Sequence, residues 1–284
     1  MMKIRAAALL SLALLCACSG RSAPPPETEP PDPHAGMVEV EDGSGGKIWV
    51  RLYEDVPASA LTREDFSEGG YTGEAYDVRR GVDVSEHQGM IDWAAAAASG
   101  VEFAVIRAGY RGYGQSGPLC PDLFFRQNME GAAANGIEVG VYFFSQAINA
   151  QEARTEAYFL LSLLSSYGPR ALSLPVYYDW EEVPYDGSRT REIRGGVITE
   201  CAVAFCETVA QAGYTPGVYA YRYLAYFDYE LPRLKDYALW IGAVGEYPDF
   251  YYAHSLWQYS ATGSVPGIAT EVDLDLLFVP RAGT

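Results

Sequence analysis

From residue 81 onward, short apolar runs alternate with helix-like stretches, and this alternation restricts the fold more than any other feature of the sequence. The strand-like runs cover residues 81–85, 101–108, 137–145, 173–181 and 214–221. The helix-like stretches between them cover residues 91–99, 121–135, 150–165 and 191–212. Strands that alternate with helices favour parallel βαβ units. The sequence therefore predicts an α/β fold built on a parallel sheet.

The spacing tightens in the last part of the chain. Strand-like runs at 238–243, 255–259 and 272–278 leave little room for full helices between them. Five β/α units followed by about three strands with short connections fit an irregular eight-stranded barrel. The alternative is an open doubly wound sheet, but no glycine-rich phosphate loop follows any of the expected strands.

The N-terminus predicts export. Residues 1–17 carry two basic side chains ahead of an apolar stretch that is too short to span a bilayer, as is typical of a signal peptide. The segment Leu15-Cys16-Ala17-Cys18 resembles a bacterial lipobox, which would make Cys18 the lipidated first residue of the mature chain. The protein would then be held at the extracytoplasmic face of a bacterial membrane. An ordinary cleaved signal peptide, and hence a secreted protein, is the alternative.

Two further segments precede the main domain. Residues 18–36 are rich in proline, which prefers an extended polyproline conformation, so we expect a lipid-anchor cysteine followed by a stiff tether. Residues 37–80 contain one short apolar run amid acidic and glycine-rich sequence, and we interpret them as a lead-in that packs on the main domain. The main domain is predicted to cover residues 81–284.

Charge excludes some classes of protein. Thirty-seven acidic residues against 20 basic residues give a formal net charge of −17, whereas a nucleic-acid-binding protein needs a basic face for phosphates. The same balance disfavours attachment to anionic lipids through a polybasic surface. The three histidines have no metal-ligand spacing, so we expect neither a metal nor another cofactor. No protein partner is indicated.

The cysteines of the main domain predict thiols. Cys201 and Cys206 are five positions apart on an expected helix, which puts their Cα atoms roughly 8–9 Å apart on different faces. A disulfide needs Cα atoms within about 7 Å, so we do not expect these two residues to be bridged. Cys120 could pair with either of them.

Acidic side chains stand at the ends of several expected strands. Asp179 and Glu181 are two positions apart, so on a strand they would point to the same side with Cα atoms ~6.6 Å apart. Adjacent carboxylates repel each other, which raises one pKa and creates the proton donor that glycoside hydrolysis requires. Asp83 and Asp273 lie on distant strands that a closed barrel would bring together. Solvated acids at strand ends are the simpler alternative.

Six segments, in their order along the chain, resemble glycoside hydrolase family 25, the lysozyme-type N-acetylmuramidases. They are GVDVSEHQG (81–89), FAVIRAGYRGYG (103–114), VGVYFFSQA (139–147), PVYYDWE (175–181), PGVYAY (216–221) and LWQYS…VPGI…VDLDLLF (256–278). The resemblance implies a flattened (β/α)5(β)3 barrel over about residues 81–279. It also implies hydrolysis, without a metal and with net retention, of the β-1,4 bond between N-acetylmuramic acid and N-acetylglucosamine in peptidoglycan.

The resemblance also assigns roles by position. Glu181 matches the general acid, and Asp179 matches its partner, which would orient the substrate's own N-acetyl group for the second catalytic role. The residues that would bind and position the sugar are Asp83, Asp273, Tyr142, Tyr219, Trp257 and, as a weaker candidate, Gln258. For each aromatic residue, ordinary core packing is the alternative.

The chain departs from the family at two positions. Phe143 stands where histidine is common, and Asp275 stands where asparagine is usual. We expect His87 and His254 at structural or rim positions. Two other functions remain as alternatives, a non-catalytic peptidoglycan-binding lipoprotein on the same fold and an enzyme for another N-acetylated polysaccharide.

Overall fold

The computed structural model describes residues 32–67 and 70–281 of the chain. The predicted signal peptide, the Cys18 lipidation position and most of the proline-rich tether lie outside these residues. The elements described below belong to one compact unit that begins at Gly36. Among the described residues, no helix combines the length and the apolar composition that crossing a bilayer requires.

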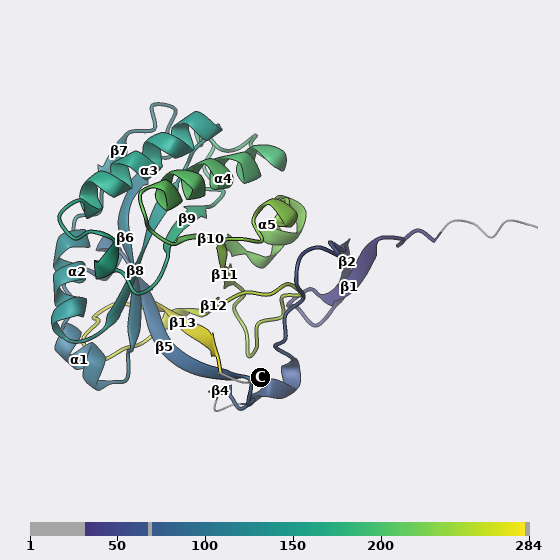
Figure 1. The fold of residues 1–284 in the computed structure, drawn as a ribbon, viewed down its shortest axis with the longest axis horizontal. Coiled ribbons are helices and arrows are strands. Elements are labelled where there is room, and N and C mark those ends of the chain that lie inside the picture. The colour runs from purple at the N-terminus through teal and green to yellow at the C-terminus, as the bar shows by residue number, and fades with distance from the viewer. Residues whose placement is uncertain (1–31, 68–69, 282–284) are drawn as a thin grey trace, which may run out of the picture. The chain divides into compact units, whose positions relative to one another are not determined.

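Eight strands form a closed barrel (Figure 1). In chain order they are β5 (Tyr76–Val84), β6 (Phe103–Arg111), β8 (Glu138–Ser145), β9 (Val176–Trp180), β10 (Pro216–Tyr221), β11 (Ala238–Gly242), β12 (Leu256–Gly263) and β13 (Val272–Pro280). Strand β5 pairs with both β6 and β13, which closes the ring. Neighbouring strands are parallel, except that β13 runs antiparallel to both β12 and β5. The predicted barrel is thereby confirmed, and the open doubly wound sheet is excluded.

Helices follow the first five barrel strands only. They are α1 (Trp93–Ala98), α2 (Phe125–Ala134), α3 (Ala150–Leu164), α4 (Gly196–Gln211) and α5 (Arg222–Phe227). Together with the three remaining strands they give the expected (β/α)5(β)3 order. The short helix α5 and the strand β7 (Leu119–Pro121), which pairs with the end of β6, were not predicted from the sequence.

Two predicted boundaries are wrong for identifiable reasons. The first barrel strand begins at Tyr76 rather than at residue 81, because β13 pairs with it from Asp83 back to Tyr76. The helix expected over 191–212 begins only at Gly196. It is preceded by Gly195 with a positive φ of 58°, a conformation that favours glycine and ends the irregular segment after β9.

Alternation along the strands separates two apolar clusters. Outward-facing residues such as Val82, Ile106 and Val141 pack in the cluster that includes residues of the helices. Inward-facing residues, among them Phe103, Tyr177 and Trp240, form a second cluster inside the barrel. Side chains thus fill the interior of the barrel near the start of the parallel strands. This leaves space for a site only near the carboxyl ends of these strands.

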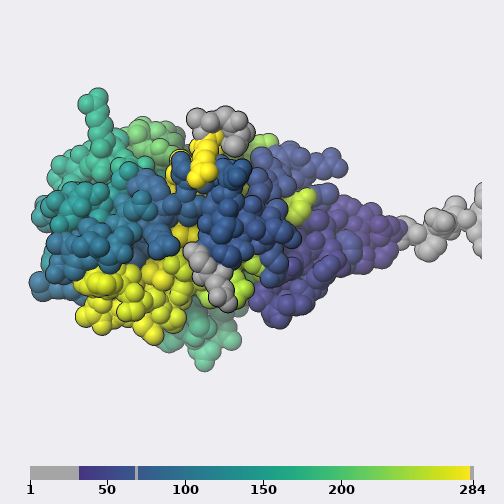
Figure 2. Space-filling model, turned by 90° about the horizontal axis from the view of Figure 1, so that it is seen from below, coloured from purple at the N-terminus to yellow at the C-terminus, as the bar shows by residue number. Residues whose placement is uncertain are grey.

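Residues 37–67 and 70–75 pack beside the strands that have no helices of their own. The ring of Phe66 packs edge-on against Trp257 and Phe278, with centroids 5.6 Å and 6.2 Å away. The hydroxyl of Tyr252 donates to the carbonyl oxygen of Arg51 at 2.6 Å. The elements of this segment are β1 (Met37–Glu41), β2 (Lys47–Arg51), the 3-10 turn Arg63–Asp65, β3 (Phe66–Ser67) and β4 (Gly70–Tyr71). Figure 2 shows the yellow C-terminal part of the chain bordering the blue part on this face, as the pairing of β13 with β5 requires.

The three cysteines of the barrel are free thiols. Cys201 and Cys206 are buried on α4, and Cys120 is half-buried on β7. The absence of a bridge between the two α4 residues agrees with their spacing, and Cys120 pairs with neither of them.

Candidate active site

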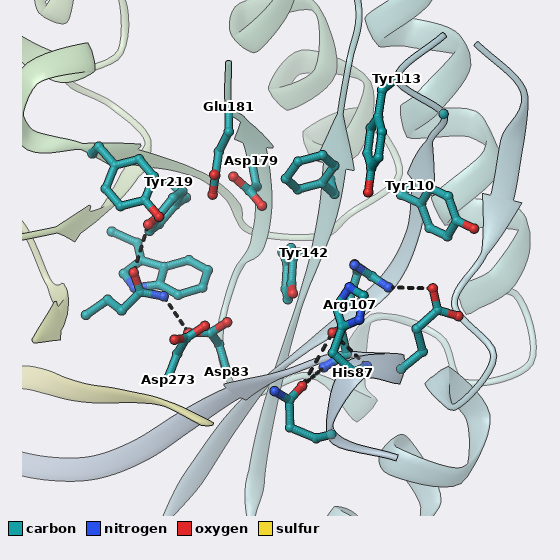
Figure 3. Close-up of a pocket in the computed structure, with 18 residues that line it drawn as sticks. Asp83, His87, Arg107, Tyr110, Tyr113, Tyr142, Asp179, Glu181, Tyr219 and Asp273 are labelled. Atoms are coloured by element: carbon teal, nitrogen blue, oxygen red, sulfur yellow. Dashed lines mark hydrogen bonds and ion pairs between the residues drawn. The ribbon is translucent and has the colours of Figure 1, made fainter. Parts of the chain in front are cut away.

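A cavity of about 460 Å³ opens at the carboxyl end of the parallel strands. Its lining includes the four acids that the sequence singled out, Asp83, Asp179, Glu181 and Asp273. Asp179 and Glu181 lie side by side at the end of β9, and Asp83 lies next to Asp273 in another part of the cavity (Figure 3). Closure of the barrel by β13 explains the second pair, because Asp273 is directly opposite Asp83 in the register of the two strands.

The end of β9 presents its two acids inward because Trp180 between them points outward. The indole Nε1 of Trp180 donates to the carbonyl oxygen of Ala147 at 3.1 Å, on the helix side of the sheet. Asp179 is only 4% exposed, and its Oδ1 has no hydrogen-bond partner among the described residues. This oxygen is thus an enclosed acceptor without a partner, in a residue that also lines the cavity.

Burial shifts the pKa values of both acids upward. Burial first, and then the charge of Glu181, raise the pKa of Asp179 well above its usual range, while Arg107 acts in the opposite direction. Burial, followed by the charge of Asp273, raises the pKa of Glu181 to about 7. Glu181 consequently keeps a proton over a pH range in which an exposed glutamate would have lost it.

Arg107 is a site residue that the sequence analysis missed. It faces inward from β6, is 7% exposed and lines the cavity. Its Nε donates to Asp122 Oδ2 at 2.8 Å and its Nη2 donates to Glu86 Oε1 at 3.0 Å. Two acids thus hold a cation close enough to Asp179 to lower the pKa of that carboxyl group. A charge in the middle of an otherwise apolar run, FAVIRAGY (103–110), was the signal that could have revealed it.

A chain of hydrogen bonds fixes one wall of the cavity. The hydroxyl of Tyr219 donates to Gln258 Oε1 at 2.8 Å, and Gln258 Nε2 donates to Asp83 Oδ2 at 2.7 Å (Figure 3). The structure thus joins Tyr219, Gln258 and Asp83, which come from β10, β12 and β5. Burial, and then the charges of Asp275 and Asp273, raise the pKa of Asp83 well above its usual range.

Trp240, rather than the predicted Trp257, is the tryptophan that lines the cavity. Its ring lies 4.6 Å from the ring of Tyr219 and 6.0 Å from that of Tyr142, and all three residues line the cavity. Trp257 does not line it, so that prediction is wrong. Neighbouring strand residues face opposite sides, and Gln258 already faces inward. Trp257 therefore points outward, where its Nε1 donates to the carbonyl oxygen of Ala243 at 2.7 Å.

The remaining positions follow the same alternation. Phe143 is fully buried on the helix side, near Phe159 and Phe205, so the residue type at this position does not bear on the cavity. His87 lies at the rim of the cavity, whereas His254 is half-buried outside it, and desolvation lowers the pKa of His254 to about 4. The rim residues that the sequence analysis did not single out include Ser85, Tyr110, Tyr113, Phe144 and Tyr221.

The arrangement suits acid–base chemistry on a sugar. A carboxyl group with a raised pKa can protonate a leaving oxygen, and a neighbouring acid can stabilise positive charge or orient a reacting group. The aromatic faces of Tyr142, Tyr219 and Trp240 match the apolar faces of sugar rings. In the described parts of the chain, no group of three or more His, Cys, Asp or Glu residues could hold a metal ion.

Comparisons with known proteins agree with this geometry. Residues 82–268 match the sequence profile described as glycosyl hydrolases family 25. The autolytic lysozyme of Clostridium acetobutylicum is 28% identical over 198 residues, which are 69% of this chain and 55% of that protein. Lysozyme M1 of Streptomyces globisporus is 25% identical over 284 residues, covering 93% of this chain and 86% of that protein.

A solved structure shares the fold. The modular autolysin LytC of Streptococcus pneumoniae, solved in complex with a synthetic peptidoglycan ligand, aligns with a TM-score of 0.64 at 24% identity. The alignment covers 85% of this chain and 56% of that one. This chain thus spans little more than half the length of the clostridial and streptococcal proteins.

Proposed function

Because this chain belongs to glycosyl hydrolases family 25, we propose that it is a lysozyme that hydrolyses peptidoglycan. The bond cleaved is the β-1,4 bond between N-acetylmuramic acid and N-acetylglucosamine. The observation that carries the proposal is the position of Glu181 beside Asp179 in a cavity with aromatic walls. The lysozymes among the relatives support the same substrate class.

Glu181 is the general acid. Burial and the charge of Asp273 raise its pKa to about 7, so a large share of the molecules carry a proton on this carboxyl group at neutral pH. As the glycosidic bond breaks, that proton moves to the leaving oxygen. The carboxylate that remains then takes a proton from the water molecule that completes hydrolysis.

Asp179 orients the acetamido group of the substrate. Asp179 lines the cavity and its Oδ1 has no partner among the described residues, so a rotation of the carboxyl group lets it accept a hydrogen bond from the acetamido N–H. The acetamido carbonyl oxygen then attacks the anomeric carbon, and water opens the resulting ring with net retention of configuration. Arg107 favours the ionised form of Asp179 through its positive charge.

The other inward-facing side chains bind the sugar. The rings of Tyr142, Tyr219 and Trp240 offer flat apolar surfaces inside the cavity. Asp83 and Asp273 accept hydrogen bonds from hydroxyl or amide groups of the sugar.

A matched pair of variants tests the proposal. Glu181→Gln cannot donate the proton, and we expect its release of reducing ends from purified peptidoglycan to fall by about 10²- to 10⁴-fold. Glu182→Gln is the control, because Glu182 is exposed and pairs with Arg194 at 2.9 Å outside the cavity. Full activity of Glu181→Gln would refute the assignment of the acid.

The reaction products show which glycosidic bond is cleaved and whether the protein is an enzyme or a wall-binding protein. Mass spectrometry should find muropeptides with N-acetylmuramic acid at the reducing end. Tight binding to peptidoglycan without any product would support a non-catalytic wall-binding protein instead. Cleavage of chitin oligomers in preference to peptidoglycan would indicate a different N-acetylated polysaccharide.

We propose further that the protein is exported and lipid-anchored at Cys18. The apolar stretch of residues 6–17 and the order Leu15-Cys16-Ala17-Cys18 support this. Acyl chains contribute ~0.8 kcal/mol per buried CH₂ to membrane binding, so two or more chains would hold the protein at the bilayer. Cys18→Ala should move the protein from the membrane fraction to the soluble fraction, and its retention in the membrane fraction would refute this anchor.

A further inference from the structure

Asp275 is a fully buried acid that the catalytic scheme does not use. It lies on β13 and is 0% exposed. Trp240 Nε1 donates to its Oδ1 at 2.8 Å. Its Oδ2 has no hydrogen-bond partner among the described residues, although it is completely enclosed. An ionised carboxylate in this position would be poorly compensated.

Asp83, which lines the cavity, is the acid that Asp275 contacts, and Asp273 contacts the same carboxyl group. The carboxyl groups of Asp275 and Asp83 are within hydrogen-bonding reach of each other. Two ionised carboxylates have no proton to share and repel each other, whereas a single proton turns the same contact into a hydrogen bond. The contact is therefore attractive only when at least one of the two groups is protonated.

Among the described residues, no positively charged side chain offsets the charge of Asp275 and Asp83 from the side of Asp275. The titratable groups that face Asp275 are Asp83 on β5, Asp273 on β13, Tyr177 on β9 and Tyr259 on β12. None of the described Lys, Arg or His side chains acts on Asp275. Burial raises the pKa of Asp275 to about 8, and the charge of Asp273 adds to this effect. Burial and Asp275 likewise raise the pKa of Asp83 well above its usual range.

We propose that Asp275 is a positioning residue that shares a proton with Asp83 and so fixes the floor of the cavity. The proposal rests on the proposed function, because Asp83 is assigned to sugar binding there. The contacts of Asp275 reach the cavity along two routes. One route passes through Asp83 and Gln258 to Tyr219, and the other passes directly to Trp240.

The shared proton has a mechanical consequence. While it is present, Asp83 is held between Gln258 Nε2 at 2.7 Å and the carboxyl group of Asp275. When it leaves, a second negative charge appears beneath a cavity that already contains Asp179 and Asp273. Asp83 is then pushed away from Asp275, and the sugar loses a fixed acceptor.

Infrared spectroscopy tests proton sharing without reference to activity. At pH 7 the wild-type protein should show a protonated-carboxyl band that is weaker in Asp275→Asn, because the amide supplies the donor permanently. In the wild type the component that is missing from Asp275→Asn should disappear as the pH rises through about 8. Equal protonated-carboxyl bands in the two proteins at pH 7 would overturn the proposal.

Kinetics test the positioning role with two variants. Asp275→Asn keeps a donor for Asp83 and an acceptor for Trp240, and we expect its kcat/KM at pH 6.5 to stay within about twofold of wild type. Asp275→Leu keeps neither, and we expect kcat/KM to fall by about 10-fold or more, a loss comparable to one hydrogen bond. Thermal melting verifies that each variant is folded. Equal activity of the two folded variants would overturn the role.

The pH profile separates positioning from mere packing. Above pH 8 the wild type should lose two protons, one from Glu181 and one from the Asp83–Asp275 pair, so log kcat/KM should fall with a slope of about −2. In Asp275→Asn the proton of the pair is absent, and the slope should be shallower by about one. An unchanged slope would overturn the proposal. Absence of any activity in the wild type would refute the proposed function, and the infrared result would still decide whether the proton is shared.

Discussion

Gln146 Nε2 donates a hydrogen bond to the carbonyl oxygen of Glu181 at 2.8 Å. The same nitrogen donates to the carbonyl oxygen of Ser145 at 2.8 Å, and the amide oxygen accepts from Thr190 Oγ1 at 3.0 Å. Gln146 is 0% exposed, so all of these bonds are shielded from water. Glu181 lies just beyond the last residue of β9, and this one side chain fixes its backbone to the neighbouring strand end.

Gln146→Ala should lower kcat by about 10- to 100-fold, because small displacements of a catalytic group cost this much. The change in KM should be small, since Gln146 does not line the cavity. We expect the free energy of unfolding to fall by about 1–3 kcal/mol, because buried partners lose their hydrogen bonds. Gln151→Ala, on an exposed position of α3, is the control for both measurements. An unchanged kcat would show that Gln146 does not position the acid.

Asp273→Asn should move the alkaline limb of the pH profile of kcat/KM to lower pH. The negative charge of Asp273 raises the pKa of Glu181, so its removal lowers that pKa from about 7 and Glu181 loses its proton earlier. The overall rate will also fall because Asp273 binds sugar in the proposed scheme, and the midpoint of the limb is therefore the quantity to measure. A midpoint that stays in place or moves to higher pH would contradict this electrostatic coupling.

The fold should become less stable as the pH rises from 6.5 to 8. Glu156 and Glu181 have pKa values raised to about 7, and Asp275 has a pKa raised to about 8, chiefly through burial. Groups that hold protons only in the folded state contribute stability that is complete below their unfolded pKa and is lost as the pH passes the folded pKa. Each contributes a slope of up to about 1.4 kcal/mol per pH unit.

The chosen pH window lies above the range in which His254 affects stability. Burial lowers the pKa of His254 to about 4, so this residue costs stability only below its ordinary pKa near 6.5. Chemical denaturation at several pH values between 6.5 and 8 gives the slope directly. Asp275→Asn should make it shallower, and a stability that is constant or rises over this interval would be inconsistent with buried protonated acids.

Phe66→Ala should destabilise the barrel by about 2–3 kcal/mol. Phe66 is half-buried and packs edge-on against Trp257 and Phe278, on strands that no helix covers, so its removal leaves apolar surface exposed. Tyr158→Ala is the matched aromatic control, because Tyr158 is 62% exposed on α3. Denaturant titration measures both variants. Equal stabilities of the two would mean that the lead-in does not support the outer face of the barrel.

The sequence predicted the barrel because short apolar runs alternate with helix-like stretches, and Gly100, Gly136 and Gly213 each follow a helix just before the next strand. The start of α4 shows where this reasoning fails, because the sequence predicts a helix from residue 191 and α4 begins only at Gly196. The irregular segment before it is held in place by Thr190, which binds Gln146, and by Arg189, which binds Glu152 at 2.6 Å. Tertiary hydrogen bonds of this kind are not visible as periodicity.

The acids of the site were predictable because a carboxylate at the end of an apolar strand is unusual. Arg107 is likewise a charged residue in an apolar strand, and the same argument could have found it. Trp240 and Trp257 show a different limit, since both are aromatic residues on short strands. The side chain of Gln258 points into the barrel, and two neighbours on a strand cannot both face the interior. Trp257 must therefore point outward, which leaves Trp240 to line the cavity.

Because β13 runs antiparallel to β5, the two ends of the barrel segment lie away from the substrate entrance. Asp83 near the end of β5 lines the cavity, whereas Tyr76 at its start pairs with Pro280, roughly 20 Å away along the strand. The backbone N–H of Arg281 donates to the carbonyl oxygen of Ala75 at 3.0 Å. Both ends of the barrel segment thus leave side by side, at the end remote from the cavity. A tag, a label or a second module fused after Arg281 would leave the path of an incoming glycan strand unobstructed.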